Sequence, residues 1–290
     1  MACGAETPAR KPVIALVVKT LNNPFFIDMQ KGAEEIAKEH HIELLVQAAE
    51  REIDVERQMQ IVENLIQRRV DVLVLVPSGS REIVPVIVKA NKANIPVVIV
   101  DTRVHGETLQ RAKGKIATFV GSDNYLGGKL AGEFAAERMK GQANVAVLEG
   151  IAGHETGDAR LRGFKDGIAG KPGMKIVASQ TANWERDQGF NVFQNLLVAH
   201  PEIDVLFAAN DQMALGAVEA IRAAGKTGRI KVIGFDATDE ARNAIRKGTM
   251  DASVAQNPAA MGRVAIKVAT RLLNGEPPLP EMPVPVEIIK

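Results

Sequence analysis

The feature that most constrains the fold is an apolar run near the N-terminus that changes into an amphipathic helix. Residues 13–18 are continuously apolar and mostly β-branched, which is typical of a strand buried on both faces of a parallel sheet. A polar segment ending in Asn23 follows, and Pro24 is tolerated in the first turn of a helix. From Phe25 the apolar residues recur at helical spacing. The stretch therefore predicts a strand, a short loop and a helix.

The same alternation of strand and helix recurs along the chain, with short connections between the segments. Further strands are predicted at 43–48, 71–76, 96–100, 116–120, 144–148, 175–179, 205–208, 230–235 and 252–255. The helices between them are predicted at 54–67, 83–93, 125–139, 159–168, 187–199, 211–224, 238–247 and 258–273. The Pro-rich segment 277–285 cannot be helical, and 286–289 could form a last short strand.

The number and order of these segments predict an α/β fold with two doubly wound domains. A chain of 290 residues exceeds one typical domain and suggests two. Right-handed crossovers between parallel strands give each domain three layers, with helices on both faces of a sheet. The pattern restarts near residues 120–123, so this junction is the first candidate for a passage between domains.

Composition and charge exclude several partner classes. The formal net charge is +1, which gives no hint of binding to nucleic acid or to an anionic membrane surface. About a dozen residues precede the first predicted strand, and they leave no room for a DNA-reading helix-turn-helix. No apolar run is long enough to span a bilayer.

The single cysteine, Cys3, forms the sequence Ala-Cys-Gly, which resembles the end of a bacterial lipoprotein signal. We expect Cys3 to be lipidated, with residues 1–11 serving as a polar N-terminal tether after removal of a signal peptide. This places the protein outside the cytoplasm, in the periplasm or on the outer face of the cytoplasmic membrane, and limits membrane contact to the lipid anchor. The alternative is an unmodified cysteine in a frayed cytosolic N-terminus.

Motifs for enzymatic chemistry are missing from the sequence. Gly127-Gly128-Lys129 is not a phosphate loop, because Asp123 stands where the pattern begins and Leu130 where a hydroxyl is needed. No G-x-G-x-x-G follows a strand, and no H-E-x-x-H occurs. We therefore predict no cofactor, no metal and no enzymatic activity.

Polar and aromatic side chains gather where the predicted strands end. They are Lys19, Asn23, Phe25, Phe26, Asp101, Asn210, Phe235, Asp236 and Gln256, and the only tryptophan, Trp184, lies in a similar loop. Taken singly, Phe26 and Phe235 could equally be core residues. Because ligands of open α/β sheets bind beyond the carboxyl ends of the strands, the set predicts a shared cleft between the domains. Rings over apolar carbons, with amides and charges round the hydroxyls, suit a small polyhydroxylated molecule.

The chain after residue 11 resembles the periplasmic sugar-binding proteins of the ribose-binding class, the receptors of bacterial ABC sugar importers. The motifs that carry the resemblance are TLNNPFF at 20–26, the strand that ends in Asp101, GSDN at 121–124, GIAG at 150–153, ANDQMALG at 209–216, GFD at 234–236 and VAQNP at 254–258.

The resemblance implies two similar domains joined by a three-strand hinge, the type I periplasmic-binding fold. It places the three passages near Gly121-Ser122, Gln256-Asn257 and Val284-Pro285. The first lobe would then comprise residues 12–121 and 257–284, and the second lobe residues 122–256 and 285–290. It also implies a sugar in the cleft, a membrane permease of an ABC importer as partner, and a monomer.

Carried over residue by residue, the resemblance assigns sugar contacts to Asn23, Phe25, Phe26, Asp101, Asn210, Phe235, Asp236 and Gln256. Departures from the ribose-binding pattern are Lys19 for a small hydroxyl residue, Val76 for an asparagine, Thr102 for an arginine and Trp184 for a phenylalanine. Asp158 aligns with the ribose-contacting arginine, and Arg160 lies two residues on. These departures resemble the allose-binding branch, and we expect a hexose, with allose first, held by Lys19, Arg160 and Trp184 as well.

Three alternatives stay open at this point. The ligand could be a polyol, an inositol or a pentose. The chain could be the effector domain of a LacI-type regulator, which shares the fold but needs a DNA-binding domain. A sugar-modifying enzyme is the third.

Overall fold

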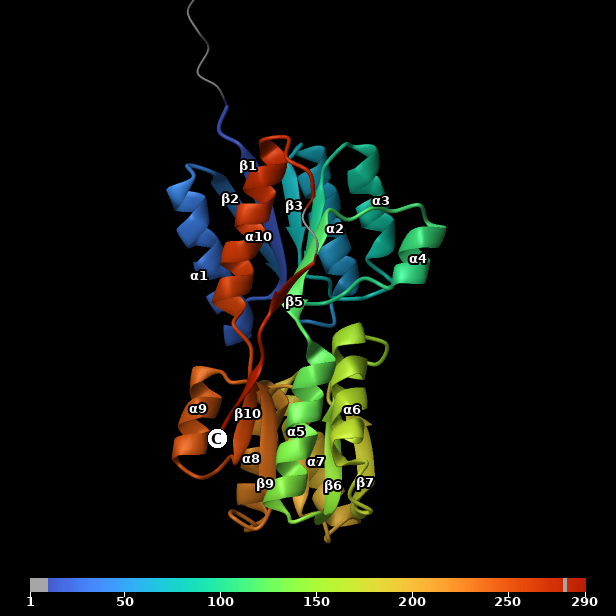
Figure 1. Cartoon of the computed structure of the whole chain (residues 1–290), viewed down its shortest axis with the longest axis vertical. Helices are drawn as coiled ribbons and strands as arrows, with labels where there is room; N and C mark the ends of the chain where they lie inside the picture. Colours follow the sequence, from blue (N-terminus) through green and yellow to red (C-terminus); the bar gives the residue numbers. More distant parts are fainter. Residues whose placement is uncertain (1–9, 279–280) are drawn as a thin grey trace, which may run out of the picture.

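The computed structural model describes residues 10–278 and 281–290 and shows two lobes stacked along the long axis (Figure 1). Each lobe contains one six-stranded sheet, with the strand orders β11-β5-β4-β3-β1-β2 and β12-β10-β9-β8-β6-β7. All strand pairs are parallel except β10 with β12. The predicted α/β class with two doubly wound domains is confirmed.

The first lobe has helices on both faces of its sheet. Its strands are β1 (Val13–Thr20), β2 (Glu43–Ala49), β3 (Val72–Leu75), β4 (Val97–Val100), β5 (Thr118–Ser122) and β11 (Met282–Val284), and its helices are α1 (Pro24–Glu39), α2 (Val55–Gln67), α3 (Val84–Lys92), α4 (Gly106–Arg111) and α10 (Pro258–Leu273). One apolar core lies under α1 and α10, and a second under α2 and α3. Residues 13–18 are buried on both faces of β1, as predicted from their unbroken apolar run.

The second lobe repeats this arrangement. Its strands are β6 (Gln142–Glu149), β7 (Gly173–Thr181), β8 (Val205–Ala208), β9 (Lys231–Asp236), β10 (Ala252–Ala255) and β12 (Glu287–Ile289), and its helices are α5 (Asn124–Arg138), α6 (Glu155–Ile168), α7 (Arg186–Ala199), α8 (Asp211–Ala223) and α9 (Asp239–Arg246). The helices α5 and α6 cover one face of the sheet, and α7 and α8 cover the other.

The chain passes between the two sheets three times, at one edge of each sheet. It leaves the first lobe after β5, returns to it after β10, and leaves it again between β11 and β12. After the second passage, α10 packs against α1 of the first lobe. We propose the lobe boundaries at 121/122, 256/257 and 284/285 on this basis.

Two elements were not predicted. The helix α4 has no buried residue, so the sequence carries no apolar stripe there. The strand β11 contains Pro283 and lies at the edge of its sheet, which is where a strand tolerates proline. The Pro-rich segment 277–285 therefore contains a strand that its sequence pattern does not indicate.

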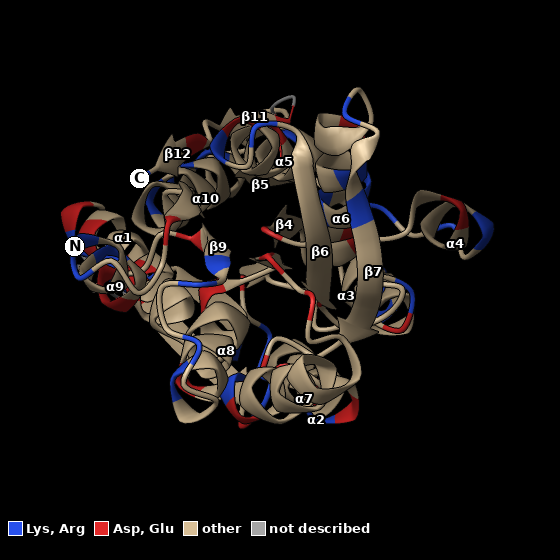
Figure 2. Cartoon of the chain, turned by 90° about the horizontal axis from the view of Figure 1, so that it is seen from below, with Lys and Arg blue, Asp and Glu red and all other residues tan. Residues whose placement is uncertain are grey.

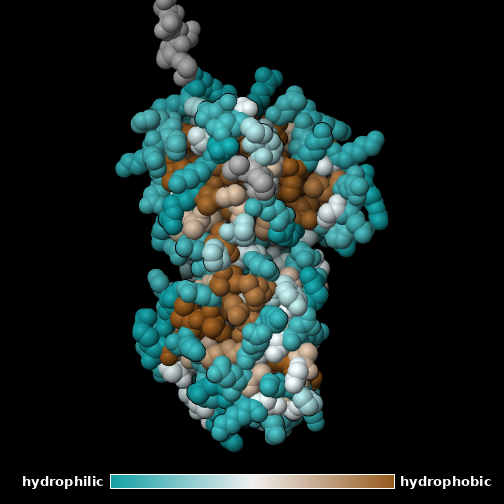
Figure 3. Space-filling model, viewed as in Figure 1, coloured by the Kyte–Doolittle hydropathy of each residue, from teal (hydrophilic) through white to brown (hydrophobic). Residues whose placement is uncertain are grey.

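The exterior is polar and of mixed charge. Acidic and basic residues lie together on peripheral helices such as α1, α4 and α9 (Figure 2). Figure 3 shows mostly hydrophilic side chains on one face, with apolar ones exposed in both lobes near the narrow waist. Within residues 10–278 and 281–290, none of the helices combines the length and the apolar character needed to cross a membrane. Cys3 lies outside the described residues.

The contact between α1 and α10 depends on two glycines and generates a stability prediction. A Cβ on Gly32 would lie 2.0 Å from the carbonyl oxygen of Ala259, and one on Gly262 would lie 2.0 Å from that of Met29. We expect Gly32→Ala to lower the free energy of unfolding by about 1–3 kcal/mol, because backbone must move. Urea unfolding tests this. Gly170→Ala is the control, since nothing lies within 4 Å of that position, and equal stability of both variants would contradict the packing.

Candidate functional site

The carboxyl ends of the strands in both lobes face a common cavity at the waist. The space between the atoms that line it is small, about 270 Å³ with the part that opens to solvent included. Its lining residues are Lys19, Asn23, Phe25, Phe26, Glu52, Asp101, Thr156, Arg160, Trp184, Asn210, Asp236 and Gln256. Every one of them is at least nine-tenths buried, so the lobes are closed round the cavity.

The first lobe contributes one cation between two carboxylates. The Nζ of Lys19, at the end of β1, lies 3.5 Å from Oδ2 of Asp101 and 3.7 Å from Oε2 of Glu52. Thr102 Oγ1 donates to Asp101 at 3.0 Å, and Asn23 Nδ2 donates to Glu52 at 3.0 Å. Asn23 also caps α1, because its Oδ1 accepts from the Phe25 amide. The cap and the ion pairs fix the polar wall of this lobe.

Burial dominates the acid–base behaviour of Glu52. It raises the pKa of the carboxyl above the ordinary value of 4.5, although the charge of Lys19 and the bond from Asn23 oppose it. Since the folded pKa is raised, the ionised carboxylate costs stability above about pH 4.5, and the cost falls as the acid becomes protonated. The charge of Lys19 therefore opposes the shift caused by burial without cancelling it.

The second lobe contributes a guanidinium, Arg160 of α6. Its Nε donates to Asn124 Oδ1 at 2.8 Å, and Nη1 donates to the carbonyl of Ala209 at 2.6 Å. Nη1 also lies 3.6 Å from Oδ1 of Asp236, and the ring of Phe235 lies under the guanidinium at 3.7 Å. Burial lowers the pKa of Arg160, and the charge of Asp236 opposes this shift most. Arg160 is thus fixed from three sides and faces the cavity with its charge.

Asp236, at the end of β9, has an unusual backbone conformation that a second carboxylate stabilises. Its φ is +110° and that of Ala237 is +49°, conformations that carry strain in residues other than glycine. The turn is tied down by Asp211, whose carboxylate accepts from the amide and hydroxyl of Thr238 and from Ser253. Burial raises the pKa of Asp211 to about 6 and that of Asp236 well above its ordinary value.

Gln256, in the second passage between the lobes, extends the wall formed by Asp236. Its Nε2 donates to Oδ1 of Asp236 at 2.8 Å. Within the described part of the chain its buried Oε1 has no hydrogen-bond partner. A buried acceptor without a donor costs free energy, so this oxygen suits a ligand that brings a hydroxyl.

Aromatic rings close the cavity at both lobes. Phe25 and Phe26 pack edge to face with centroids 5.3 Å apart, and Lys19 Nζ lies 5.6 Å from the ring centre of Phe26. On the other lobe, Trp184 is buried, and the Arg160 guanidinium lies 5.6 Å from its ring. Asn210 caps α8 and donates to the carbonyl of Trp184 at 3.1 Å. The cavity thus combines apolar rings with a dense set of charges.

The structure brings together ten of the eleven residues predicted from the sequence. Phe235 is the exception, since it lies in the core and supports Arg160 from below. Glu52 and Thr156 line the cavity but were not predicted. Glu52 follows β2 by three residues, so the strand-end rule that selected Asp101 would have found it. Thr156 lies in the first turn of α6 and carries no such signal.

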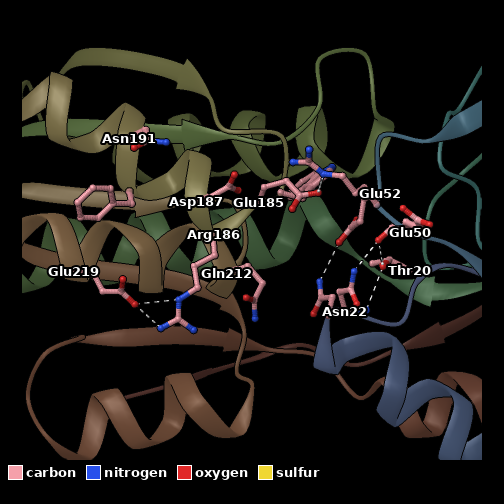
Figure 4. A pocket seen from close by; sticks show the side chains of 14 residues that line it. Thr20, Asn22, Glu50, Glu52, Glu185, Arg186, Asp187, Asn191, Gln212 and Glu219 are labelled. Atoms are coloured by element: carbon pink, nitrogen blue, oxygen red, sulfur yellow. Dashed lines mark hydrogen bonds and ion pairs between the residues drawn. The ribbon is translucent and has the colours of Figure 1, made fainter.

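An open groove leads to the cavity on the side away from the hinge. It shares Asn23, Glu52 and Trp184 with the cavity. Figure 4 shows its two walls, with Thr20, Asn22 and Glu50 on one side and Arg186 and Gln212 on the other. Arg51 Nε lies 3.4 Å from Glu185 Oε1 across this groove. The groove therefore adjoins the cavity, and the Arg51–Glu185 pair joins the lobes at its rim.

Comparisons with known proteins agree with this geometry. A family model described as "Periplasmic binding protein domain" matches residues 14–277. The D-ribose/D-allose-binding protein of Pseudomonas aeruginosa is 40% identical over 291 residues, covering 98% of this chain and 90% of that protein. The ribose import binding protein RbsB of Escherichia coli K12 is 37% identical over 279 residues, covering 96% and 90%.

A solved structure agrees as well. It is an ABC transporter periplasmic solute binding protein from Actinobacillus succinogenes 130z with bound D-allose, and it has a TM-score of 0.91 at 40% identity, covering 97% of this chain and 98% of that one.

The chain belongs to the periplasmic binding protein family. This family consists of transport receptors and not of enzymes, in agreement with the prediction from the missing motifs. Within residues 10–278 and 281–290, no cluster of three or more His, Cys, Asp or Glu side chains could hold a metal ion.

The position of Lys19 between two buried carboxylates predicts a pH-dependent loss of stability. We expect Lys19→Met to lower the free energy of unfolding at pH 7.5 by roughly 3 kcal/mol or more, because Glu52 and Asp101 lose their cation. Without Lys19 the pKa of Glu52 rises further. At pH 5 more of the acid is protonated, so the deficit shrinks.

Urea unfolding of wild type and variant at both pH values measures this. Lys31→Met serves as the control, because Lys31 is exposed and pairs with the exposed side chain of Asp28 on its own helix. The placement of Lys19 between two buried carboxylates would be contradicted if Lys19→Met did not lower the free energy of unfolding, or if the loss were larger at pH 5 than at pH 7.5.

Proposed function

We propose that this protein is the extracytoplasmic receptor of an ABC-type sugar importer and that it encloses one monosaccharide between its lobes. The observation that carries the proposal is the composition of the closed cavity. Two cations, three carboxylates and three side-chain amides converge between aromatic rings. Such a set satisfies many hydroxyl groups at once, and charged partners strengthen the bonds in a dry site.

We further propose a hexose, with D-allose first. Two relatives support this order, because one is named for D-ribose and D-allose and the other holds D-allose. Trp184 supports it as well, since an indole covers more of a sugar face than a phenyl ring does. Polyols, inositols and pentoses remain as competing ligands in the test.

The proposed contacts divide between the lobes. Phe25 or Phe26 would cover one face of the sugar and Trp184 the other. The hydroxyl partners would be Lys19, Asn23, Glu52, Asp101, Arg160, Asn210, Asp236 and Gln256. Phe235 would act indirectly by supporting Arg160. A sugar lacking one hydroxyl would leave a buried charged group unpaired and would bind poorly.

The proposed cycle has no covalent step. The open form exposes both walls, the sugar binds one of them, and hinge motion at the three passages brings the other lobe over it. The closed form presents a surface made by both lobes to a membrane permease. We propose that the receptor works as a monomer and is anchored through a lipid on Cys3.

Calorimetric titration tests the proposal. The chain is unfolded and refolded to remove carried-over ligand and is then titrated with allose, ribose, glucose, galactose, myo-inositol and alditols. We expect one tight exothermic binder. Asp101→Ala should weaken it by tenfold to about a hundredfold, because the hydrogen bond to a charged group is worth roughly 1.5–3 kcal/mol, and Trp184→Ala should weaken it similarly.

Asp166→Ala is the matched control, because Asp166 is an exposed carboxylate of α6 outside the cavity. The absence of a heat signal for every sugar in the panel would reject the proposed ligand class. An affinity that is the same in wild type, Asp101→Ala and Trp184→Ala would reject the proposed contacts.

A further inference from the structure

His154 lies on the boundary between the lobes and contacts both. It is the N-cap residue of α6 in the second lobe and is 3% exposed. Its Nε2 lies 2.5 Å from the carbonyl oxygen of Ser78, which follows β3 in the first lobe. Its Nδ1 lies 3.4 Å from Nε1 of Trp184, which belongs to the second lobe. The imidazole of His154 thus links the first lobe to the aromatic wall of the cavity.

These two contacts assign the proton on the ring. The Ser78 carbonyl can only accept, so Nε2 carries hydrogen, and the indole N–H of Trp184 can only donate, so Nδ1 is the acceptor. A single neutral tautomer satisfies both. An imidazolium ring cannot accept from Trp184, because both of its nitrogens carry hydrogen.

Trp184 needs such support. Its φ is +68°, in the left-handed region that bulky residues rarely adopt. Its ring packs directly on Gly150, where a Cβ would lie 1.9 Å from Cζ2. The backbone is held by Asn210, and the indole N–H is bonded to His154. Losing the His154 contact therefore frees the ring that faces the cavity.

Two further bonds join the lobes beside His154. The amide of Glu155 donates to Ser80 Oγ at 3.2 Å, and Thr156 Oγ1 donates to Thr102 Oγ1 at 3.1 Å. Each connects the start of α6 to a segment that follows a strand of the first lobe. None of these bonds survives separation of the lobes, so the set belongs to the closed form.

We propose that His154 is a positioning residue for sugar binding, which orients Trp184 only while its ring is uncharged and which is removed from water when the lobes close. The inference rests on the proposed function, in which the sugar is bound by the closed form. It makes closure, and with it sugar affinity, depend on the protonation of one histidine. Acid favours the open, sugar-free receptor through this residue.

The electrostatics of the site agree with this role. Burial, together with the charge of Lys19 on β1, lowers the pKa of His154 from its ordinary 6.5 to about 3, although the bond to Ser78 opposes the shift. When the lobes separate, the ring meets water and its pKa returns toward 6.5. The open form then takes up a proton that the closed form excludes, so closure weakens as the pH falls below about 6.5.

Other charged groups near the ring must be separated from this effect. Lys19 acts on it from β1 and is itself paired with Glu52 and Asp101, and Glu155 is its neighbour on α6. Burial raises the pKa of Glu52, so closure by itself promotes protonation of that acid and favours the closed form at low pH. A histidine variant is therefore required to isolate the contribution of His154.

The test is calorimetric titration of the full chain with D-allose and D-ribose at pH 7.5 and pH 5.0. His154→Gln keeps an amide donor but does not titrate in this range. From pH 7.5 to 5.0 we expect the dissociation constant of wild type to rise relative to that of His154→Gln by at least tenfold, up to about thirtyfold for a pKa of 6.5 in the open form. His200→Gln changes a half-buried histidine that is paired with Glu202 away from the cavity, and it should behave as wild type. Equal pH dependence of wild type and His154→Gln overturns the proposal.

Fluorescence of the only tryptophan gives a readout without sugar. We expect sugar-free wild type to show an emission change with a midpoint near pH 6.5, because His154 and Trp184 are in the same lobe, and His154→Gln to lack it. Sugar should move the midpoint below pH 5. If neither sugar binds but the His154-dependent transition is present, the proposed ligand fails and the contact to Trp184 stands. If wild type and His154→Gln show the same emission profile, the positioning role is wrong whether or not sugar binds.

Discussion

The structure depends on charged side chains that are buried where the two lobes meet. Lys19 with Glu52 and Asp101 forms one wall, and Arg160 with Asp236 forms the other, all at least nine-tenths buried in the closed form. Removing such groups from water costs several kcal/mol per ion, and ion pairs recover this only with good geometry and further hydrogen bonds. The Lys19 distances of 3.5 and 3.7 Å and the Arg160 distance of 3.6 Å are long for charge-assisted bonds. A polyhydroxylated ligand between them would complete the pairing.

The fold supplies the rigid frame for these charges. Parallel strands end at one edge of each sheet, and both edges face the waist, so residues distant in sequence converge without long loops. Asp236 and Trp184, which have positive φ, lie at this edge, and Asp211, Asn210 and His154 hold them there. The three passages of the chain lie at the opposite side from the groove that opens to solvent. A hinge at one side and an opening at the other are what a closing receptor requires.

Much of this could be predicted from the sequence, because buried parallel strands and amphipathic helices leave unmistakable patterns. The predicted strand at 13–18 falls within β1, and the predicted helix begins within one residue of the start of α1. Nine cavity residues came from the rule that strand ends and the loops after them deliver ligand contacts, and Arg160 came from the family resemblance. Phe235 packs in the core and does not line the cavity, because a phenylalanine at a strand end can face either one and only packing decides. The strand β11 was not predicted because it contains a proline. His154 was not predicted because its hydrogen-bond partners lie 76 and 30 residues away in the sequence.

The central claim is that the two lobes close over a monosaccharide. Small-angle X-ray scattering of the refolded, ligand-free chain, before and after addition of a sugar that binds it stoichiometrically, tests this most directly. The account predicts that the radius of gyration falls on sugar addition and that the sugar-bound profile matches the closed structure in Figure 1. A stoichiometric binder that leaves the scattering profile unchanged would contradict it.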